Sequence, residues 1–516
     1  MRRFARVPKL LPRPMPRSQA RPAITGCPPP RASPHVLRML STSASTNINN
    51  RDVHNAAAFA EAEPPAANNE RVLFQTPDEV LSLGQGYLYY AGPAPATDTE
   101  AGVLNRVEGV LTLARLRDAC PCPSCIHPST RQKTHTSGEA AREVATLSDV
   151  QARMGEADGV PGLFVQWAEH EGFYPLGLIQ RLLAGRVRGT SYLEDTLQRN
   201  LWDRETFLRD AKNFYTEYSD LHAGKRGEKM DARPEALLRL LEQLQVYGLA
   251  VVRGLPTNKT GNQECALRDL AESVGLLRNT FYGETWDVRN VANSKNVAYT
   301  NLNLGLHVDL LYFALPPRFQ MLHSLRNRVV GGESYFVDSF AAAQQLKSTR
   351  PELYASLQRN MIEYEYDNDG HYLSYQHPVL PAGDLAEPGL HSAINWSPPF
   401  QGPAVQRPVD VNGQATLEAE EEFYEACDAF QANLDDPKFR HEFLLKEGEC
   451  VLFDNQRVLH ARTAFRDKTE EEIMRDGTIC VPGESTRWLK GCYLDGSTVW
   501  DKLAVLNEQV RGKKSI

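Results

Sequence analysis

The residues that most constrain the fold of this chain are His307, Val308 and Asp309, with His460 far downstream. In a β-strand side chains alternate between faces, so His307 and Asp309 are expected to point the same way and Val308 the opposite way. Two histidines and one carboxylate form the ligand set of non-haem Fe(II) sites, which keep open positions on the metal. For an isolated HxD triplet, a polar strand with an unrelated histidine is the more frequent explanation.

The sequence around these residues favours a β fold. The triplet lies in a stretch rich in strand formers, residues 296–325, which Pro316-Pro317 interrupts. The turn signal Gly331-Gly332 precedes a further strand-like run, and His460 lies in another short one, VLHARTAF. Short strands bounded by Gly, Pro and Asn turns predict a double-sheet jelly roll with its ligands pointing inward.

The bulk properties of the chain exclude some classes of partner. With 516 residues, two domains plus a tail are expected. The formal net charge is −8 and no basic stripe recurs, so nucleic acid is not an expected partner. No stretch approaches the roughly 18–20 apolar residues needed to cross a bilayer, so no membrane segment is expected.

The N-terminus has a different composition from the rest of the chain. Its first 51 residues hold nine arginines, one lysine and no acidic residue, and Ser and Thr cluster at 41–46. This composition is typical of a mitochondrial transit peptide, and it predicts a matrix protein, with the cytoplasm as the alternative. A disordered basic arm without a targeting role is the competing interpretation.

Three cysteines form a CxCxxC cluster at Cys120, Cys122 and Cys125. Thiolates this close together repel one another unless a cation neutralises them, and tetrahedral zinc is the usual one. The fourth ligand is either His127 or His170; we favour His170, because His127 follows Cys125 too closely to reach round the same ion. Four protein ligands leave no open position, which favours a structural role over a catalytic one.

These patterns predict a protein that is mainly β with some α, in two domains. The polar stretch 129–158 inside the first domain is expected to be an exposed insertion. The expected divisions are 1–50 transit peptide, 51–70 linker, 71–185 zinc-binding β domain, 186–230 helical connection and 231–510 the domain with the iron ligands.

Seven motifs occur in the order LRDACPCPSC, WAEH, FYGETWDV, NVAYTNLNLGLHVD, GGESYFVDSF, FDNQRVLHAR and RWLKGCYLD. Over roughly residues 105–505 the chain resembles the gamma-butyrobetaine dioxygenase and trimethyllysine dioxygenase family. The resemblance implies a 2-oxoglutarate-dependent oxygenase with an N-terminal zinc domain and a C-terminal double-stranded β-helix. It also implies Fe(II), O2, ascorbate as reductant and a homodimer. The implied ligands are His307, Asp309 and His460 for iron, and Cys120, Cys122, Cys125 and His170 for zinc.

The far carboxylate of 2-oxoglutarate calls for a bidentate guanidinium. The candidates after His460 are Arg462, Arg466, Arg475 and Arg487. Arg475 lies nearest the family's usual spacing but in an acidic, loop-like stretch, whereas Arg487 heads the motif RWLKGCYLD. We therefore predict that Arg487 binds the cosubstrate.

The family's substrates carry a trimethylammonium group, which cannot donate a hydrogen bond and is best held by aromatic faces. Ordinary β packing explains any single tyrosine on a strand equally well. By resemblance, Asn296 and Asn395 are expected to contact the substrate carboxylate. The positions that match the family's aromatic cage are Tyr282, Trp286, Tyr299 and Tyr493.

One departure from the family pattern affects the substrate. Gamma-butyrobetaine members have a tyrosine directly after the aspartate ligand, where this chain has Leu310, while Tyr312-Phe313 is similar to the trimethyllysine members. The expected reaction is hydroxylation of gamma-butyrobetaine to L-carnitine, with trimethyllysine or another small molecule as alternatives. A zinc-stabilised scaffold protein with a vestigial iron site is the alternative from another class. His323 is expected to be an ordinary packed histidine.

Overall fold

The computed structural model describes residues 70–93, 106–183, 193, 197–222, 232–289, 300–386, 388–403, 406–481 and 483–512. The predicted transit peptide, residues 1–50, and all of the predicted linker except Glu70 lie outside these ranges. Within them, every helix is too short or too polar to cross a membrane.

Residues 70–183 share a hydrophobic core whose buried residues run from Leu81 to Ile179. Two antiparallel sheets and three helices contribute to it. The sheets have the orders β1 (Arg71–Gln75), β2 (Val80–Gly84), β3 (Tyr87–Pro93), β4 (Arg106–Thr112) and β5 (Gln151–Ala157), β6 (Val160–Gln166), β7 (Glu171–Pro175). The helices are α2 (Leu113–Asp118), α3 (Ser137–Thr146) and α4 (Leu176–Leu183).

Residues 129–158 are mostly exposed, as expected, but they are not an insertion outside the fold, because they form α3 and β5. Helix α3 begins at a capping box, in which Thr136 and Glu139 each accept a hydrogen bond from the other's backbone N–H. Ala140 is 1% exposed, and β5 pairs with β6 along its whole length. The stretch is polar because most residues of α3 face outward.

The rest of the described chain is built on two larger sheets. The six-stranded sheet is antiparallel apart from its last pair, and the four-stranded sheet is antiparallel throughout. The six-stranded order is β10 (Thr285–Arg289), β21 (Arg487–Leu494), β12 (Phe319–Asn327), β18 (Cys450–Asp454), β9 (Leu249–Arg253), β8 (Tyr215–Glu217). The four-stranded order is β11 (Leu304–His307), β19 (Val458–Arg462), β14 (Ser334–Asp338), β17 (His441–Phe443).

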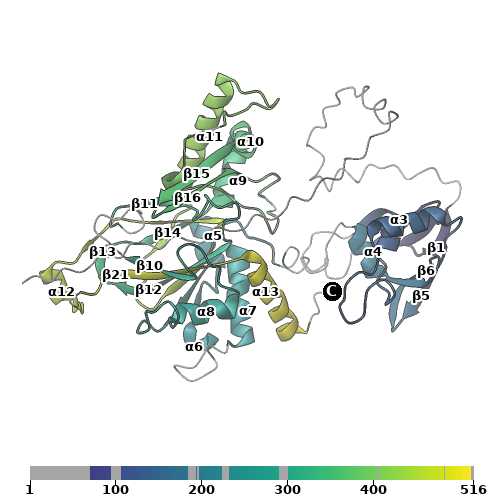
Figure 1. The fold of residues 1–516 in the computed structure, drawn as a ribbon, viewed down its shortest axis with the longest axis horizontal. Helices are drawn as coiled ribbons and strands as arrows, with labels where there is room; N and C mark the ends of the chain where they lie inside the picture. The colour runs from purple at the N-terminus through teal and green to yellow at the C-terminus, as the bar shows by residue number, and fades with distance from the viewer. Residues whose placement is uncertain are drawn as a thin grey trace, which may run out of the picture. The chain divides into compact units, whose positions relative to one another are not determined.

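One face of the six-stranded sheet is covered by α7 (Pro234–Tyr247), α8 (Ala266–Val274) and α13 (Gly496–Arg511) (Figure 1). Proline in the first turn starts α7, and Gly248, with φ of 72°, ends it. Strand alternation divides β12 between two environments. Phe319 and Met321 pack against these helices, whereas Gln320 and Leu322 line a cavity on the other face.

The two sheets pack against each other through a second group of buried residues, among them Phe336 of β14 and Phe453 of β18. Trp202 and Phe207 belong to the same group, so this part of the expected helical connection, residues 186–230, is buried with the sheets. It contains α5 (Arg204–Asp210) and α6 (Tyr218–Leu221). It also contains β8, which pairs in parallel with β9 and so extends the six-stranded sheet.

Further elements pack beside the four-stranded sheet and share a core with it. They include a long hairpin and three helices (Figure 1). These elements are α9 (Ser339–Thr349), α10 (Pro351–Arg359), β15 (Met361–Asn368), β16 (His371–Pro378), the 3-10 turn Pro398–Phe400 and α11 (Leu417–Asp435). A short pair, β13 (Val329–Gly331) with β20 (Phe465–Asp467), and α12 (Glu470–Asp476) complete the described elements.

Candidate active site and metal centres

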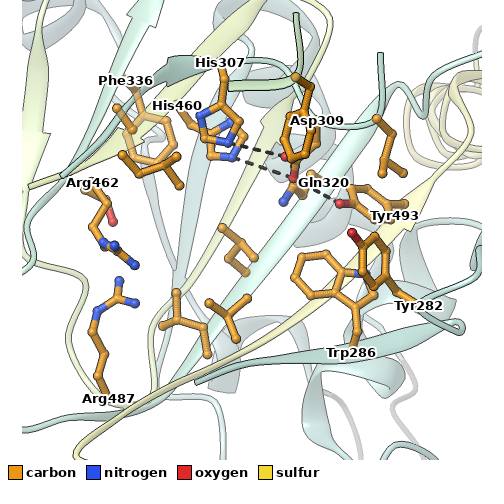
Figure 2. Close-up of a pocket in the computed structure, with 18 of the residues that line it drawn as sticks. Tyr282, Trp286, His307, Asp309, Gln320, Phe336, His460, Arg462, Arg487 and Tyr493 are labelled. Atoms are coloured by element: carbon orange, nitrogen blue, oxygen red, sulfur yellow. Dashed lines mark hydrogen bonds and ion pairs between the residues drawn. The ribbon is translucent and has the colours of Figure 1, made fainter. Parts of the chain in front are cut away.

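Neighbouring strands of the four-stranded sheet bring two of the three predicted iron ligands together, and the third lies just beyond one of these strands. His307, the last residue of β11, lies opposite His460 of β19, and their ring centroids are 4.1 Å apart. The Asp309 carboxylate lies 3.4 Å from Nε2 of His307 and 3.8 Å from Nε2 of His460. The possible ligand atoms of the three residues all lie within 4.8 Å of one another (Figure 2).

Asp309 reaches the histidines in a different way from the one the sequence predicts. Strand β11 ends at His307, so Asp309 lies in the turn that follows, outside the strand. The next residue, Leu310, has φ of 65°, a left-handed conformation that costs a residue with a Cβ roughly 1–2 kcal/mol. The direction of the carboxylate is therefore set by this turn and not by strand alternation.

The arrangement of the three side chains suits a divalent metal. Nδ1 of His307 lies 2.8 Å from the carbonyl oxygen of Gly305, which can only accept, so Nδ1 carries a hydrogen and Nε2 is the ring nitrogen that faces Asp309. Burial and the neighbouring His307 lower the pKa of His460 to about 3, so this ring is neutral. Burial alone would raise the pKa of Asp309, but His307, His460 and Tyr493 outweigh it and lower the pKa. Two imidazole nitrogens and a carboxylate fit Fe(II).

A cavity between the two sheets opens on these ligands (Figure 2). The period of two along each strand selects the residues that face it, as in Arg487, Leu489 and Tyr493 of β21. Besides the three ligands, its lining consists of Tyr282, Trp286, Val288, Leu304, Leu310, Tyr312, Gln320, Leu322, Ser334, Phe336, Phe400, Ala461, Arg462, Arg487, Leu489 and Tyr493.

One end of the cavity carries two guanidinium groups, those of Arg462 and Arg487, which point toward each other (Figure 2). Burial and the neighbouring Arg462 lower the pKa of Arg487 to about 9, and burial lowers that of Arg462 to about 10. Arg462 donates to the carbonyl oxygens of Thr300 and Leu302, at 2.8 and 2.6 Å. Two buried cations side by side make this end a strong site for an anion.

The other predicted arginines lie elsewhere. Arg475 is exposed on α12 and pairs with Asp476 at 2.9 Å. Arg466 is also exposed and pairs with Glu472 at 2.7 Å. Neither of these two arginines lines the cavity.

The other end of the cavity is aromatic. The Trp286 ring lies between Tyr282 and Tyr493, with centroid distances of 6.3 and 5.1 Å. The Tyr493 hydroxyl donates to Oδ2 of Asp309 at 3.0 Å, so this residue touches the metal site as well as the aromatic group (Figure 2). Tyr312 and Phe400, whose rings are 5.3 Å apart, extend the aromatic wall.

A family model described as "Taurine catabolism dioxygenase TauD, TfdA family" matches residues 217–478, a range that includes the three predicted iron ligands. The chain belongs to this dioxygenase family. It is 38% identical to "Dioxygenase str8" of Strobilurus tenacellus over 75% of this chain and 83% of that protein. It is 30% identical to a gamma-butyrobetaine dioxygenase of Pseudomonas sp. (strain AK-1), covering 76% and 89%. It is 26% identical to the mitochondrial trimethyllysine dioxygenase of Rattus norvegicus, covering 76% and 81%.

These relatives confirm the predicted family and enzyme class: the protein is an Fe(II)- and 2-oxoglutarate-dependent dioxygenase. The alternative of a scaffold protein with a vestigial iron site is therefore set aside. The fold is that of the TauD-like oxygenases, with mixed sheets and helices.

Not every residue predicted to bind substrate lines the cavity of this dioxygenase. Tyr299 and Asn296 lie outside the described residues. The prediction for Asn395 differs from the structure: its side-chain amide donates to the carbonyl oxygen of Pro378 at 2.8 Å, and it is not part of the cavity lining. A buried amide needs such a partner, and here the neighbouring loop supplies it.

Sequence reasoning missed Gln320 and Phe400, and it noted Tyr312 only as a family likeness. Strand alternation in RFQMLHSL could have assigned Gln320 to the face opposite Phe319. His323 is fully buried and is not part of the cavity lining. Its burial, together with the positive charge of the neighbouring Lys490, lowers its pKa to about 4.

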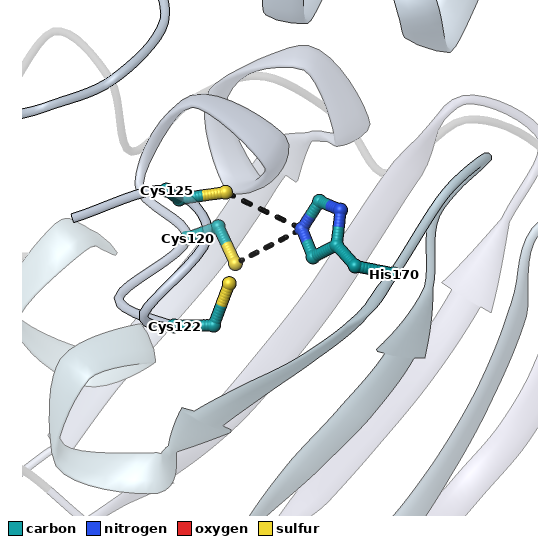
Figure 3. A group of neighbouring side chains, drawn as sticks. All are labelled: Cys120, Cys122, Cys125 and His170. Atoms are coloured by element: carbon teal, nitrogen blue, oxygen red, sulfur yellow. Dashed lines mark hydrogen bonds between the residues drawn. The ribbon is translucent and has the colours of Figure 1, made fainter. Parts of the chain in front are cut away.

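The cysteine cluster forms a second candidate metal site (Figure 3). Nε2 of His170 lies 3.3 Å from Sγ of Cys125 and 3.6 Å from Sγ of Cys120, and Cys122 completes the group. Three thiol sulfurs and one imidazole nitrogen fit tetrahedral Zn(II). His127 is outside this group: it is exposed, and its Nδ1 accepts from the backbone N–H of Thr130 at 3.3 Å.

Arg117 and Glu143 surround the sulfur cluster. Arg117 donates to Sγ of Cys125 at 3.2 Å and to Glu143 at 2.7 Å. The other carboxylate oxygen of Glu143 accepts from the backbone N–H of Ala168, close to His170. The ion pair of Arg117 and Glu143 thereby connects the segment that carries the cysteines with the segment that carries His170.

Proposed function

We propose that this dioxygenase hydroxylates a small molecule with a trimethylammonium group, and that gamma-butyrobetaine, giving L-carnitine, is its substrate. The observation that carries the proposal is the aromatic wall of Tyr282, Trp286 and Tyr493 beside Asp309. A quaternary cation gains about 0.5–2 kcal/mol from each aromatic face, depending on desolvation. The names of the relatives at 30% and 26% identity support the same substrate class.

In this proposal His307, Asp309 and His460 hold Fe(II), and Arg487 binds the far carboxylate of 2-oxoglutarate with Arg462 beside it. When bound there, Fe(II) would supply the oxidative chemistry that joins conversion of 2-oxoglutarate and O2 to succinate and CO2 with hydroxylation of the substrate. The residues of the chain position the reactants. The arginine end orients the cosubstrate toward the ligands, and the aromatic end holds the cation so that one methylene faces the metal.

Leu310 favours trimethyllysine as a second candidate substrate. It lines the cavity directly after the aspartate ligand, where a tyrosine of the gamma-butyrobetaine members would offer a hydroxyl to the substrate.

The test is turnover of the purified enzyme with Fe(II), 2-oxoglutarate and ascorbate. Gamma-butyrobetaine, trimethyllysine and an isostere of gamma-butyrobetaine with carbon in place of nitrogen are supplied separately, and succinate is measured. We expect substrate-dependent succinate from a trimethylammonium compound and little from the isostere. Equal turnover of the charged compound and its isostere would refute the cage.

For the whole protein we propose a double-stranded β-helix built from the two larger sheets, within a catalytic domain of residues 231–510. Residues 71–185 are proposed as a structural zinc domain held by Cys120, Cys122, Cys125 and His170, followed by a connection at 186–230. The basic N-terminus, residues 1–50, is proposed as a transit peptide to the mitochondrial matrix. A homodimer is proposed from the family resemblance.

A further inference from the structure

The side chain of Asn455 lies beside an iron ligand and is fully buried. It follows β18 directly, in the turn that leads into β19 and His460. Its amide makes three hydrogen bonds. Oδ1 accepts from the backbone N–H of Asp309 at 2.9 Å, and Nδ2 donates to the carbonyl oxygens of Asp309, at 3.2 Å, and Pro317, at 3.1 Å.

The hydrogen bonds between Asn455 and the backbone of Asp309 resemble those that a neighbouring strand would make. One amide group bonds both the N–H and the C=O of the same residue, as an adjacent strand does in a sheet. Strand β11 has already ended at His307, so Asp309 lies just beyond the backbone pairing with β19. The Asn455 amide supplies the pairing that the strand no longer provides. Together with the bond to Pro317, these two bonds use all the hydrogen-bonding capacity of the amide apart from one lone pair.

The backbone conformation of the next residue explains why such a contact is needed. Leu310 has φ of 65°, which only glycine adopts without steric cost. A turn held in this conformation relaxes unless its surroundings fix it. Fixing the backbone at Asp309 also fixes the direction in which its carboxylate leaves the chain.

We propose that Asn455 is a positioning residue that holds the Asp309 carboxylate in its direction toward His307 and His460. Asn455 touches no reacting atom; it acts through the backbone of the ligand. This inference rests on the iron site proposed above. It deepens that proposal by naming the residue that keeps the carboxylate in place against the conformational cost at Leu310.

The neighbouring residue offers a matched control. Nε2 of Gln456 donates to the carbonyl oxygen of Pro316 at 2.9 Å, and its Oε1 accepts from Arg318 at 3.0 Å. Gln456 thus ties the same loop to the same turn as Asn455 does, but no hydrogen bond joins its side chain to Asp309. A general loss of loop anchoring would affect both variants equally.

The experiment measures Mn(II) binding to the zinc-loaded full chain by electron paramagnetic resonance. Loss of a residue that orients a metal ligand typically weakens binding 10–100-fold, so we expect Asn455→Ala to raise the Mn(II) Kd by that factor. Gln456→Ala should change the Kd by less than about twofold. Adding Leu310→Gly to Asn455→Ala should restore part of the affinity, because glycine accepts positive φ without steric cost. Equal losses in Asn455→Ala and Gln456→Ala, or no rescue, would overturn the proposal.

Asn455→Asp covers the case in which the alanine variant does not fold. It keeps the size and the acceptor for the Asp309 N–H but cannot make both donated bonds. Weaker Mn(II) binding is therefore expected from misdirection of Asp309, and unchanged or tighter binding contradicts the proposal. If Asp309→Ala binds Mn(II) as the wild type does, the iron site itself is wrong. If only Asp309→Ala loses Mn(II), the site stands and the role of Asn455 fails.

Discussion

Tyr493 contacts both the aromatic end of the cavity and the predicted iron site. Its ring packs 5.1 Å from Trp286, and its hydroxyl donates to Asp309 at 3.0 Å. We predict that Tyr493→Phe keeps the aromatic face but weakens Fe(II) binding roughly tenfold, as loss of a ligand's hydrogen-bond partner does. Anaerobic Fe(II) titration measures this. Tyr282→Phe is the control, since the Tyr282 hydroxyl lies beside Tyr312 and Tyr366 and not Asp309; an equal loss in this variant would contradict the prediction.

Substitutions at Arg487 and Arg475 are expected to have different effects on the KM for 2-oxoglutarate. Arg487→Lys replaces a planar, two-point guanidinium with a point charge, so the KM for 2-oxoglutarate should rise about tenfold or more. Arg475→Lys should leave this KM unchanged, because Arg475 is exposed and bonded to Asp476. Succinate formation at varied 2-oxoglutarate measures both. If the two effects were reversed, the assignment of the cosubstrate site would be wrong.

The predicted iron ligands could be chosen from the sequence because this combination of residues is rare, and the structure brings His307, Asp309 and His460 together. The turn at Leu310 and the contact from Asn455 were not readable, since both depend on backbone geometry between distant segments. The prediction for Asn395 came from resemblance alone, and the structure bonds this amide to Pro378 instead.

Strand β21 contributes alternate residues to the cavity lining, with Arg487 toward one end of the cavity and Tyr493 toward the other. Between them Gly491 lies opposite Trp286 in the register, and a Cβ at Gly491 would approach the indole to 2.2 Å. We predict that Gly491→Ala displaces Trp286 and weakens binding of the trimethylammonium substrate by about 1–2 kcal/mol, the contribution of one desolvated aromatic face.

The KM for 2-oxoglutarate should stay constant in this variant, because Arg487 is left in place. Gly261→Ala is its control, since nothing lies within 4 Å of a Cβ at that position. A similar loss in both glycine variants, measured as the substrate Kd by calorimetry, would argue against displacement of the indole.

The main strands were predictable from their composition: β12, β14 and β19 lie largely in runs that the sequence marks as strands. The elements that sequence reasoning missed are short or amphipathic. Helix α3 begins at a capping box, T-x-x-E, which is a sequence signal for a helix start that the polarity of the segment concealed. Strand β8 has three residues, too few for any periodicity, and it becomes a strand only by pairing with β9.

For the whole molecule, the cysteine cluster is expected to set the solubility of the N-terminal part. Replacing Cys122 with Ser should remove one zinc per chain and lower soluble yield, because a structural zinc site contributes to folding directly. Metal analysis distinguishes the fourth ligand: His170→Ala should lower zinc content, and His127→Ala should leave it intact. Zinc loss in His127→Ala with retention in His170→Ala would reverse the assignment.

We propose that His307, Asp309 and His460 hold the iron that couples 2-oxoglutarate to hydroxylation of a trimethylammonium substrate. The most direct test compares the wild type with Asp309→Ala, using the most active trimethylammonium compound and measuring succinate and hydroxylated product together. The wild type should form both in equal amounts. Asp309→Ala should keep its zinc and its thermal unfolding temperature and form neither product in response to substrate. Substrate-dependent succinate at the wild-type rate in Asp309→Ala would contradict the account.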